Sequence, residues 1–521
     1  MVEPASTGID AAANSPADAR LLRGRAVRGG VMSLISQLIR MLTTLLTTLI
    51  VARYLEPEEF GLFAVAFSIQ CLAAILRDSG LANALIQKKD VTDAHLNSVL
   101  WAGVAFSLVL AGLLALFAEP ISSFYMQPRL RPILWVMTVP VIVQAFTSVQ
   151  EAQLRKQLRF GRLMVAESGS ALLASIVAIV AAVLGAGVWA LVLRMVVVAM
   201  LLTVSCWWIS PWRPRWAFSF AALRSLWVFG GFLFLTSLMV FGRSRLDSLI
   251  IGKMIGVAAA GTFFMARHLS LGTLQQIVGA VARVMFPVFS LIQDDETLLR
   301  SAFLTATRAL ATLIFPIIAG FVVLAPEAVA VILPETWESA GVLVQIIALH
   351  GILQCVNNPA AQLLYARGRT RLQFVYSLVI GVAVVISFIV GAYWHLMGVA
   401  VCWTITAFTM GPIVLWCATR EVHLSFVRVL IHLVPPTLAA IGAGAAARFA
   451  IWAWLWLDYP HGIGLLVCAT LVGCASYLGL CRLLLRDTFR QILRDLSPTR
   501  LFGRSFKGAQ GGDVPEAIGD E

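Results

Sequence analysis

Ionisable side chains occur inside segments that are otherwise apolar. The stretch FGRSRLDSLIIGK, residues 241–253, follows WVFGGFLFLTSLMV and holds Arg243 and Asp247 at a spacing of i, i+4, which places both on one face of a helix. A charged group at the centre of a bilayer costs roughly 2.5–3.5 kcal/mol, so such groups usually face the protein interior or a wet cavity. Arginine there is suited to bind phosphate or pyrophosphate, because its planar guanidinium donates hydrogen bonds in pairs to phosphoryl oxygens.

Three further apolar segments carry comparable groups. One has a polar stripe at i, i+4, i+7 and i+8, formed by Arg40, Thr44, Thr47 and Thr48. Another holds Arg77 beside Asp78, and a third holds Arg267 beside His268. We therefore expect a substrate-binding site built from Arg40, Arg77, Asp78, Arg243, Asp247, Arg267 and His268.

Purely structural roles for these residues stay open. Arg243 with Asp247, and Arg77 with Asp78, could be ion pairs that only neutralise each other. Snorkelling to the interface or a local hydrogen bond could explain a less clustered set of polar residues within the apolar segments, Glu167, Arg194, Arg308 and His350. Two further cations, Arg53 and Lys253, lie at the predicted outer ends of their helices and could simply anchor them there.

Composition indicates the elements that must position these residues. The chain has 521 residues, of which 60% are hydrophobic and 13% charged, whereas an ordinary globular domain is about a quarter charged. About 18–20 consecutive apolar residues in a helix span the hydrocarbon core of a bilayer. The sequence thus predicts an all-α, polytopic membrane protein of about 14 transmembrane helices, at 30–53, 60–84, 97–118, 132–150, 163–184, 187–209, 226–251, 258–280, 302–324, 340–363, 372–391, 396–418, 430–451 and 462–484.

Lys and Arg gather in alternate connections between the predicted spans. They precede the first span and follow the last, whereas the other connections include the acidic stretches LEPEE and LPETWE. Because short cationic loops stay in the cytoplasm, we expect both termini to be cytoplasmic. The net charge of +12 then reflects topology, with anionic lipid headgroups as its partner. These cations are scattered between spans, so nucleic acid is not an expected partner.

The sequence contains no motif for a metal, a cofactor or a nucleotide. The eight cysteines lack the paired spacing of a zinc site or a disulfide framework. No glycine-rich loop of the GxxxxGK[ST] type is present, so ATP hydrolysis is not expected. Residues 1–20 are polar and precede a span too long for a secretory signal, and the tail after Leu501 has a disordered composition.

An internal repeat organises the chain. Shifting the sequence by 200 residues places LIVARYLEPEEFGLFAVA, residues 49–66, over LIIGKMIGVAAAGTFFMA, residues 249–266, without a gap, and Arg53 over Lys253. We predict a cytoplasmic tail at 1–29, six-helix lobes at 30–210 and 225–418, helices 13 and 14 at 430–485, and a tail at 486–521. The intramembrane charges favour spans 1, 2, 7 and 8, which are equivalent in the two lobes, so we expect a cationic vestibule between them.

Four stretches, ARYLEPEEFGLFAVA, RDSGLANALIQKKD, RLDSLIIGKMIG and VMFPVFSLIQDDETLLR, resemble the polysaccharide (lipopolysaccharide and exopolysaccharide) flippases of the multidrug/oligosaccharidyl-lipid/polysaccharide exporter superfamily. The resemblance covers about residues 27–425. One departure is GTFF at 261–264, where the family usually has GYY or a similar aromatic pair.

The resemblance implies that the chain is not an enzyme but a flippase that moves an undecaprenyl-diphosphate-linked oligosaccharide across the bacterial inner membrane by alternating access. It implies that Arg40, Arg77, Arg243 and Arg267 hold the diphosphate, with Asp78 and Asp247 orienting them or titrating. It further implies a coupling cation or the membrane potential as energy source and a glycan polymerase as partner.

Three other functions fit parts of the sequence. A drug or metabolite exporter of the same superfamily shares the topology but needs fewer arginines in its pocket. A membrane-bound glycan polymerase or ligase has similar hydropathy, yet it commonly carries a sizeable periplasmic loop, and the longest outer connections here are about 15 residues. A nonenzymatic assembly scaffold would tolerate loss of the intramembrane charges.

Overall fold

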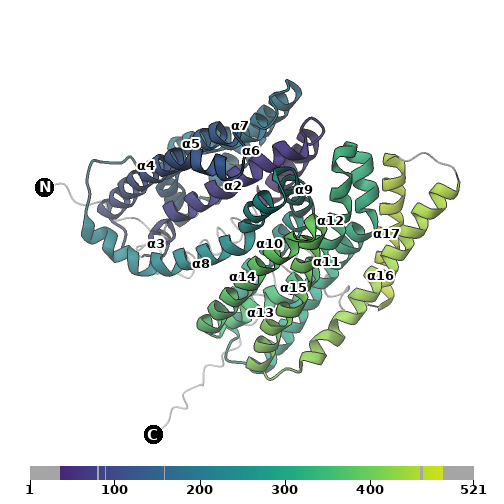
Figure 1. Ribbon diagram of the computed structural model, residues 1–521. Coiled ribbons are helices and arrows are strands. Elements are labelled where there is room, and N and C mark those ends of the chain that lie inside the picture. Colours follow the sequence, from purple (N-terminus) through teal and green to yellow (C-terminus); the bar gives the residue numbers. More distant parts are fainter. Residues whose placement is uncertain (1–35, 79–80, 89, 158, 458–461, 485–521) are drawn as a thin grey trace, which may run out of the picture. The chain divides into compact units, whose positions relative to one another are not determined.

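The computed structural model describes residues 36–78, 81–88, 90–157, 159–457 and 462–484. All its regular elements are helices, and the described residues form no β-strand (Figure 1). This confirms the predicted all-α class. The two predicted tails, residues 1–29 and 486–521, lie outside the described residues.

The region of the first predicted lobe is a succession of helices. They are helix Ser36–Val51, α2 (Pro57–Asp78), α3 (Leu81–Gln87), α4 (Asp93–Phe124), α5 (Leu130–Lys156), α6 (Phe160–Val183) and α7 (Trp189–Ile209). The start of α2 follows from its sequence: Pro57 has the backbone angle of a helical first turn, and Glu58 and Glu59 complement the positive end of the helix dipole.

The remaining elements follow in the same manner. They are α8 (Phe220–Met254), α9 (Val257–Arg267), the π-helix η1 (His268–Gly272), α10 (Thr273–Leu291), α11 (Glu296–Ile332), the 3₁₀ turn η2 (Glu335–Trp337), α12 (Glu338–Ala348), α13 (His350–Ala366), α14 (Thr370–Ala392), α15 (His395–Glu421), α16 (Phe426–Trp456) and α17 (Ile463–Leu484). At the start of α11, hydrogen bonds from the Leu298 N–H and the Thr297 hydroxyl lower the pKa of the Asp295 carboxyl.

Eleven of the described helical segments are long and apolar enough to cross a membrane. They correspond to the predicted spans other than the first, seventh and eighth. Helix Ser36–Val51 is a shorter apolar helix that covers most of the first predicted span. Helix α8 covers the seventh, and α9, η1 and α10 follow one another through the eighth. The structure is therefore consistent with the expected fourteen spans.

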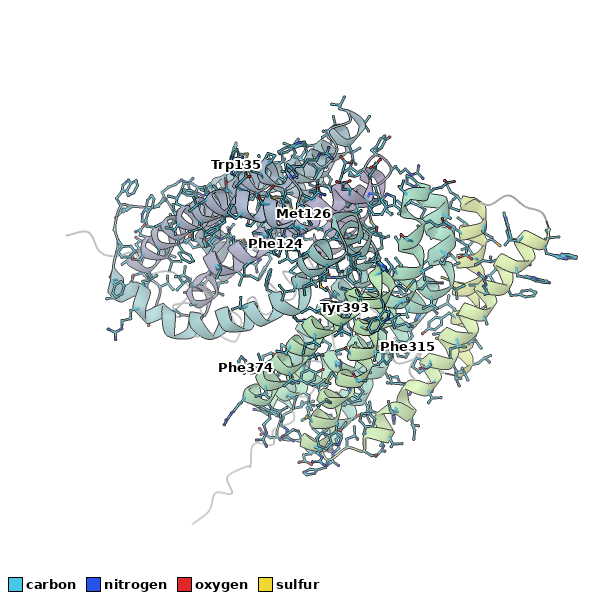
Figure 2. All side chains as sticks on the ribbon, in the orientation of Figure 1. Phe124, Met126, Trp135, Phe315, Phe374 and Tyr393 are labelled. Carbon is cyan, nitrogen blue, oxygen red and sulfur yellow. The ribbon has the colours of Figure 1, made fainter. Side chains whose placement is uncertain are left out.

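The surface carries large apolar side chains. Trp135, Phe374 and Tyr393, labelled in Figure 2, are 46%, 43% and 76% exposed, while polar Asn97 and Gln150 are buried. A water-soluble protein keeps most of its large apolar groups inside and its polar groups outside. Large apolar side chains on the surface, around a core that is also apolar, are typical of a protein whose surroundings are lipid.

Contacts group the chain into two compact units. Of the described residues, those within 36–283, 325–350 and 368–413 form the first unit, and those within 284–324, 351–367 and 414–484 form the second. In the first unit α2 packs against α9, α5 and α8, and α6 packs along α7; in the second unit α16 packs along α17. The predicted lobe boundaries, 30–210 and 225–418, stay predictions, as does the separate placement of residues 430–485.

Helices α2 and α9 touch through two glycines that are 200 residues apart. A Cβ added at Gly61 would lie 1.8 Å from the carbonyl oxygen of Val257, and one added at Gly261 would lie 1.8 Å from that of Pro57. Both distances are far below any real contact, so only glycine permits this approach. Pro57 and Val257 are themselves 200 residues apart, and the contact is therefore reciprocal. Such reciprocity is what the 200-residue sequence repeat predicts.

Candidate anion-binding site

A cavity of about 300 Å³ lies in the first unit, beside helix Ser36–Val51. This helix presents residues at i, i+3, i+4, i+7 and i+8, which form a single face. The opposite wall comes from η1 and the start of α10. The lining residues are Gln37, Arg40, Met41, Thr44, Leu45, His268, Gly272, Thr273 and Gln276. The predicted first and eighth spans thus meet at one polar cavity.

Arg40 is the arginine that lines this cavity. Its guanidinium forms an ion pair with Glu167 of α6 and donates a hydrogen bond to Ser36 Oγ at 2.7 Å. The Arg40 side chain is 34% exposed, so part of it stays accessible from the cavity. Glu167 also has Arg155 within 3.7 Å, and this carboxylate therefore lies between two cations.

The wall opposite Arg40 is shaped by the π-helix η1. A π turn inserts an extra residue into the helix and is frequent at functional sites. The His268 ring stacks on Phe264, with ring centroids 6.0 Å apart and planes 5° from parallel. Gln276 of α10 accepts a hydrogen bond from Gln37, which joins the two walls.

Arg267 is held by Asp247, which lies on the neighbouring helix α8. Their side chains form an ion pair and are 16% and 1% exposed. The sequence spacing had suggested Arg243 as the partner of Asp247; Arg243 belongs to α8, but its side chain lies outside the described part of the structure. Asp247 Oδ1 is buried and has no hydrogen-bond partner among the described residues.

Arg77 is not among the residues that line the cavity. It is buried in α2 and donates hydrogen bonds to the Val141 carbonyl oxygen at 3.3 Å and to Gln144 Oε1 at 3.2 Å, both on α5. The side chain of Asp78, the expected neighbour of Arg77, lies outside the described part of the chain. These contacts join α2 to α5.

Two arginines outside the predicted set lie close to the cavity. Arg194 of α7 donates a hydrogen bond at 2.9 Å to Oγ1 of Thr44, which is a lining residue. The guanidinium carbon of Arg245 in α8 lies 4.8 Å from the centroid of the Phe67 ring. The Phe67 ring packs edge-on against the Phe264 ring, with centroids 6.5 Å apart. Gln37 lies three positions before Arg40 and extends the polar stripe of Arg40, Thr44, Thr47 and Thr48 that the sequence shows. Arg194 carried no such signal, because its partner is 150 residues away.

Positive charge exceeds negative charge around the cavity. Arg194, Arg245 and Arg267 lie near the lining residue His268, and Arg40 lines the same cavity. Among the described side chains, these four guanidinium groups and the two carboxylates paired with them, Glu167 and Asp247, leave an excess of two positive charges. A polar cavity with that balance favours an anionic ligand. No group of three or more His, Cys, Asp or Glu residues that could hold a metal occurs among the described residues.

Solved membrane-protein structures share the fold of this chain. The structure is similar to the lipid II flippase MurJ in an inward closed conformation, with a TM-score of 0.69, 13% identity and coverage of 89% of this chain and 100% of that one. It is also similar to an inward-facing multidrug resistance MATE family transporter, with a TM-score of 0.56, 17% identity and coverage of 76% and 98%. These likenesses concern the fold.

Sequence comparison gives the family. The family model described as polysaccharide biosynthesis protein matches residues 50–342, and the chain belongs to this family. It is 25% identical to the lipopolysaccharide biosynthesis protein WzxC of Escherichia coli, over 68% of this chain and 73% of that protein. It is also 25% identical to the succinoglycan biosynthesis transport protein ExoT of Rhizobium meliloti, over 85% and 90%.

Proposed function

We propose that this protein is a flippase for an oligosaccharide linked to undecaprenyl diphosphate. It transfers this lipid from the cytoplasmic to the periplasmic leaflet of a bacterial inner membrane, with both termini of the chain in the cytoplasm. Membership of the polysaccharide biosynthesis family supports the proposal, as do relatives named for lipopolysaccharide biosynthesis and succinoglycan transport. The process includes no step that makes or breaks a covalent bond.

The observation that carries the proposal is the cavity lined by Arg40 and His268. These residues come from the first and eighth predicted spans, and the surrounding charges leave an excess of two positive charges. A diphosphate offers several phosphoryl oxygens to guanidinium donors. The polyprenyl tail stays in lipid, and the sugar occupies the polar space beside the diphosphate.

Glu167 gives a means of binding and release. Its carboxylate neutralises Arg40. A diphosphate that enters the cavity exchanges with this carboxylate, and the return of Glu167 to Arg40 expels the head group on the other side. Binding energy is thereby kept moderate, which transport requires because a ligand held too tightly in one state is not released.

The other predicted arginines act through their neighbours. Arg267, fixed by Asp247, supplies positive potential behind the cavity, and Arg77 keeps α2 on α5. A coupling cation or the membrane potential, worth about 2.3 kcal/mol per charge per 100 mV, drives the cycle. A glycan polymerase takes the flipped product on the far side.

The test is lipid flipping by purified protein in proteoliposomes. A panel of undecaprenyl diphosphates carrying fluorescent oligosaccharides is incorporated, and the label that moves between leaflets is followed with an impermeant quencher. Arg40→Gln removes charge-assisted hydrogen bonds, so the rate should fall about tenfold or more. Arg40→Lys should retain an intermediate rate, because the charge stays while the paired donors are lost.

Arg131→Gln is the matched control. Arg131 is 47% exposed, pairs with Glu119 at 2.7 Å and lines no part of the cavity. Its replacement should leave the flipping rate unchanged. Equal rates for Arg40→Gln and the parent protein, with both correctly inserted, would contradict the proposed site.

A further inference from the structure

Two cations at equivalent positions of the repeat make the same unusual contact. Arg53 Nε donates a hydrogen bond to the carbonyl oxygen of Ile332 at 2.9 Å. Lys253 Nζ donates one to the carbonyl oxygen of Phe124 at 2.6 Å. Arg53 follows helix Ser36–Val51, whereas Lys253 lies in the last turn of α8. A cation that only anchors its helix at the membrane surface would not need a hydrogen bond to a carbonyl oxygen of another helix.

The acceptors are equivalent as well. Phe124 is the last residue of α4 and Ile332 is the last residue of α11, and these are the third predicted spans of the first and second repeats. The last carbonyls of a helix lack partners within the helix and lie at its negative end, so a cation there is favourable. Each repeat thus caps a helix of the other.

A second hydrogen bond runs in the opposite sense at each contact. Tyr125, directly after α4, donates from its hydroxyl to the Leu249 carbonyl oxygen of α8 at 3.1 Å. Trp337, which follows α11, donates from Nε1 to the Ala52 carbonyl oxygen at 3.1 Å. Phe124 is labelled in Figure 2, and its ring also lies under Lys253 Nζ at 4.2 Å. Four hydrogen bonds, two on each side, therefore tie the repeats together.

The bonds of Arg53 and Ala52 lie just beyond the end of helix Ser36–Val51, whereas Arg40, which lines the cavity, lies near the start of that helix. Arg40 is separated from Val51 by 11 residues, or about 16 Å along a helix. The glycine contact between Gly61 and Gly261 lies in the same region, just after the start of α2 and of α9. The sequence predicts that this end faces the periplasm.

We propose that Arg53 and Lys253 are gate residues that lock the two repeats together at the outer end of the bundle. All four hydrogen bonds must break before the cavity can open outward, since each joins elements that belong to different repeats. The pairing stabilises the outward-closed state. This inference does not depend on which molecule is transported.

The experiment measures outside access to the cavity. The reporter is Leu45→Cys, a lining position, in a full-length chain whose eight native cysteines are replaced by alanine. An impermeant maleimide is added outside spheroplasts, and the labelling rate is measured. Each single variant, Arg53→Gln or Lys253→Gln, should raise the rate about threefold, and the double variant about tenfold, because the two capping bonds act together against one opening.

Charge-conserving variants and a distant arginine serve as controls. Arg53→Lys and Lys253→Arg keep a cation at the helix end and should label at nearly the parent rate. Arg131→Gln removes another cation near the end of α4 and should have no effect. If the double variant does not give a monodisperse protein, the labelling rates of the two single variants test the proposal, and each should be about three times that of the parent.

Two results would overturn the proposal. One is a labelling rate in the Gln variants equal to that of the parent, and the other is an equal rise in Arg131→Gln. Labelling needs no substrate, so a failure here leaves the flippase proposal intact. Conversely, a protein that flips none of the lipids tested could still show the gate.

Discussion

The arginines of this membrane protein differ in how far their side chains are exposed. Arg40 lines the cavity and is 34% exposed, although Glu167 pairs with it. Arg267 is 16% exposed, and its partner Asp247 is almost fully buried. A buried ion pair contributes little net stability but becomes costly when one partner is lost, because the remaining charge is left uncompensated. The difference in exposure is the basis for proposing Arg40, and not Arg267, as the arginine that meets the ligand.

Asp247→Asn should destabilise the protein by about 3 kcal/mol, because it leaves the Arg267 charge inside the membrane without a carboxylate. The double variant Asp247→Asn with Arg267→Gln should recover more than half of that loss. Thermal unfolding of the purified protein in one detergent checks both. Additive losses in the double variant would mean that the two side chains do not depend on each other.

At this scale the sequence predicted which residue types lie in the membrane but not their partners. Spacing reveals neighbours on one helix, such as Arg243 and Asp247 at i, i+4. The carboxylate partners of Arg40 and Arg267, and the hydroxyl partner of Arg194, lie on other helices. A single sequence carries no information on such long-range pairs, because they arise only when the helices pack.

Among the elements, α2 and α9 approach each other closely. Gly61 and Gly261 let each helix place its backbone against a carbonyl oxygen of the other. Small residues at such crossings are typical of helix packing in membranes, where close van der Waals contact replaces the hydrophobic effect. The crossing also lies next to the four hydrogen bonds of the proposed gate.

Gly61→Ala should therefore destabilise the protein by about 1–3 kcal/mol, as overpacking does elsewhere. The added methyl group would lie 1.8 Å from the Val257 carbonyl oxygen, and the helices must separate to admit it. Gly103→Ala in α4 is the matched control, because a Cβ at that position meets nothing within 4 Å. The melting temperature should fall for the first variant and stay level or rise for the second; equal behaviour would contradict the contact.

The sequence predicted the membrane-spanning helices better than the irregular turns and breaks within them. Runs of apolar residues marked nearly all the spans, since the length of an apolar run follows directly from bilayer thickness. The π turn at His268–Gly272 and the break at Leu349 between α12 and α13 were not predicted. Both leave the apolar pattern unchanged and depend on packing, so hydropathy does not reveal them.

For the whole molecule, the repeat is the feature that connects fold and function. The 200-residue shift seen in the sequence reappears in two sets of reciprocal contacts. Helices α2 and α9 touch at Gly61 and Gly261, and the end of the first helix of each repeat contacts the end of the third helix of the other repeat. Alternating access needs two similar halves that can rock about a common site. The cavity lined by Arg40 and His268 lies between elements of the two repeats, as that mechanism requires.

The central claim is that this cavity receives the diphosphate of a lipid in transit. The most direct measurement is an electron cryo-microscopy structure of the full chain in a lipid nanodisc with an undecaprenyl-diphosphate-linked oligosaccharide. We predict diphosphate density within hydrogen-bonding distance of the Arg40 guanidinium, between helix Ser36–Val51 and η1, with Glu167 displaced from Arg40. Head-group density outside this cavity, with the Arg40–Glu167 pair intact, would contradict the account.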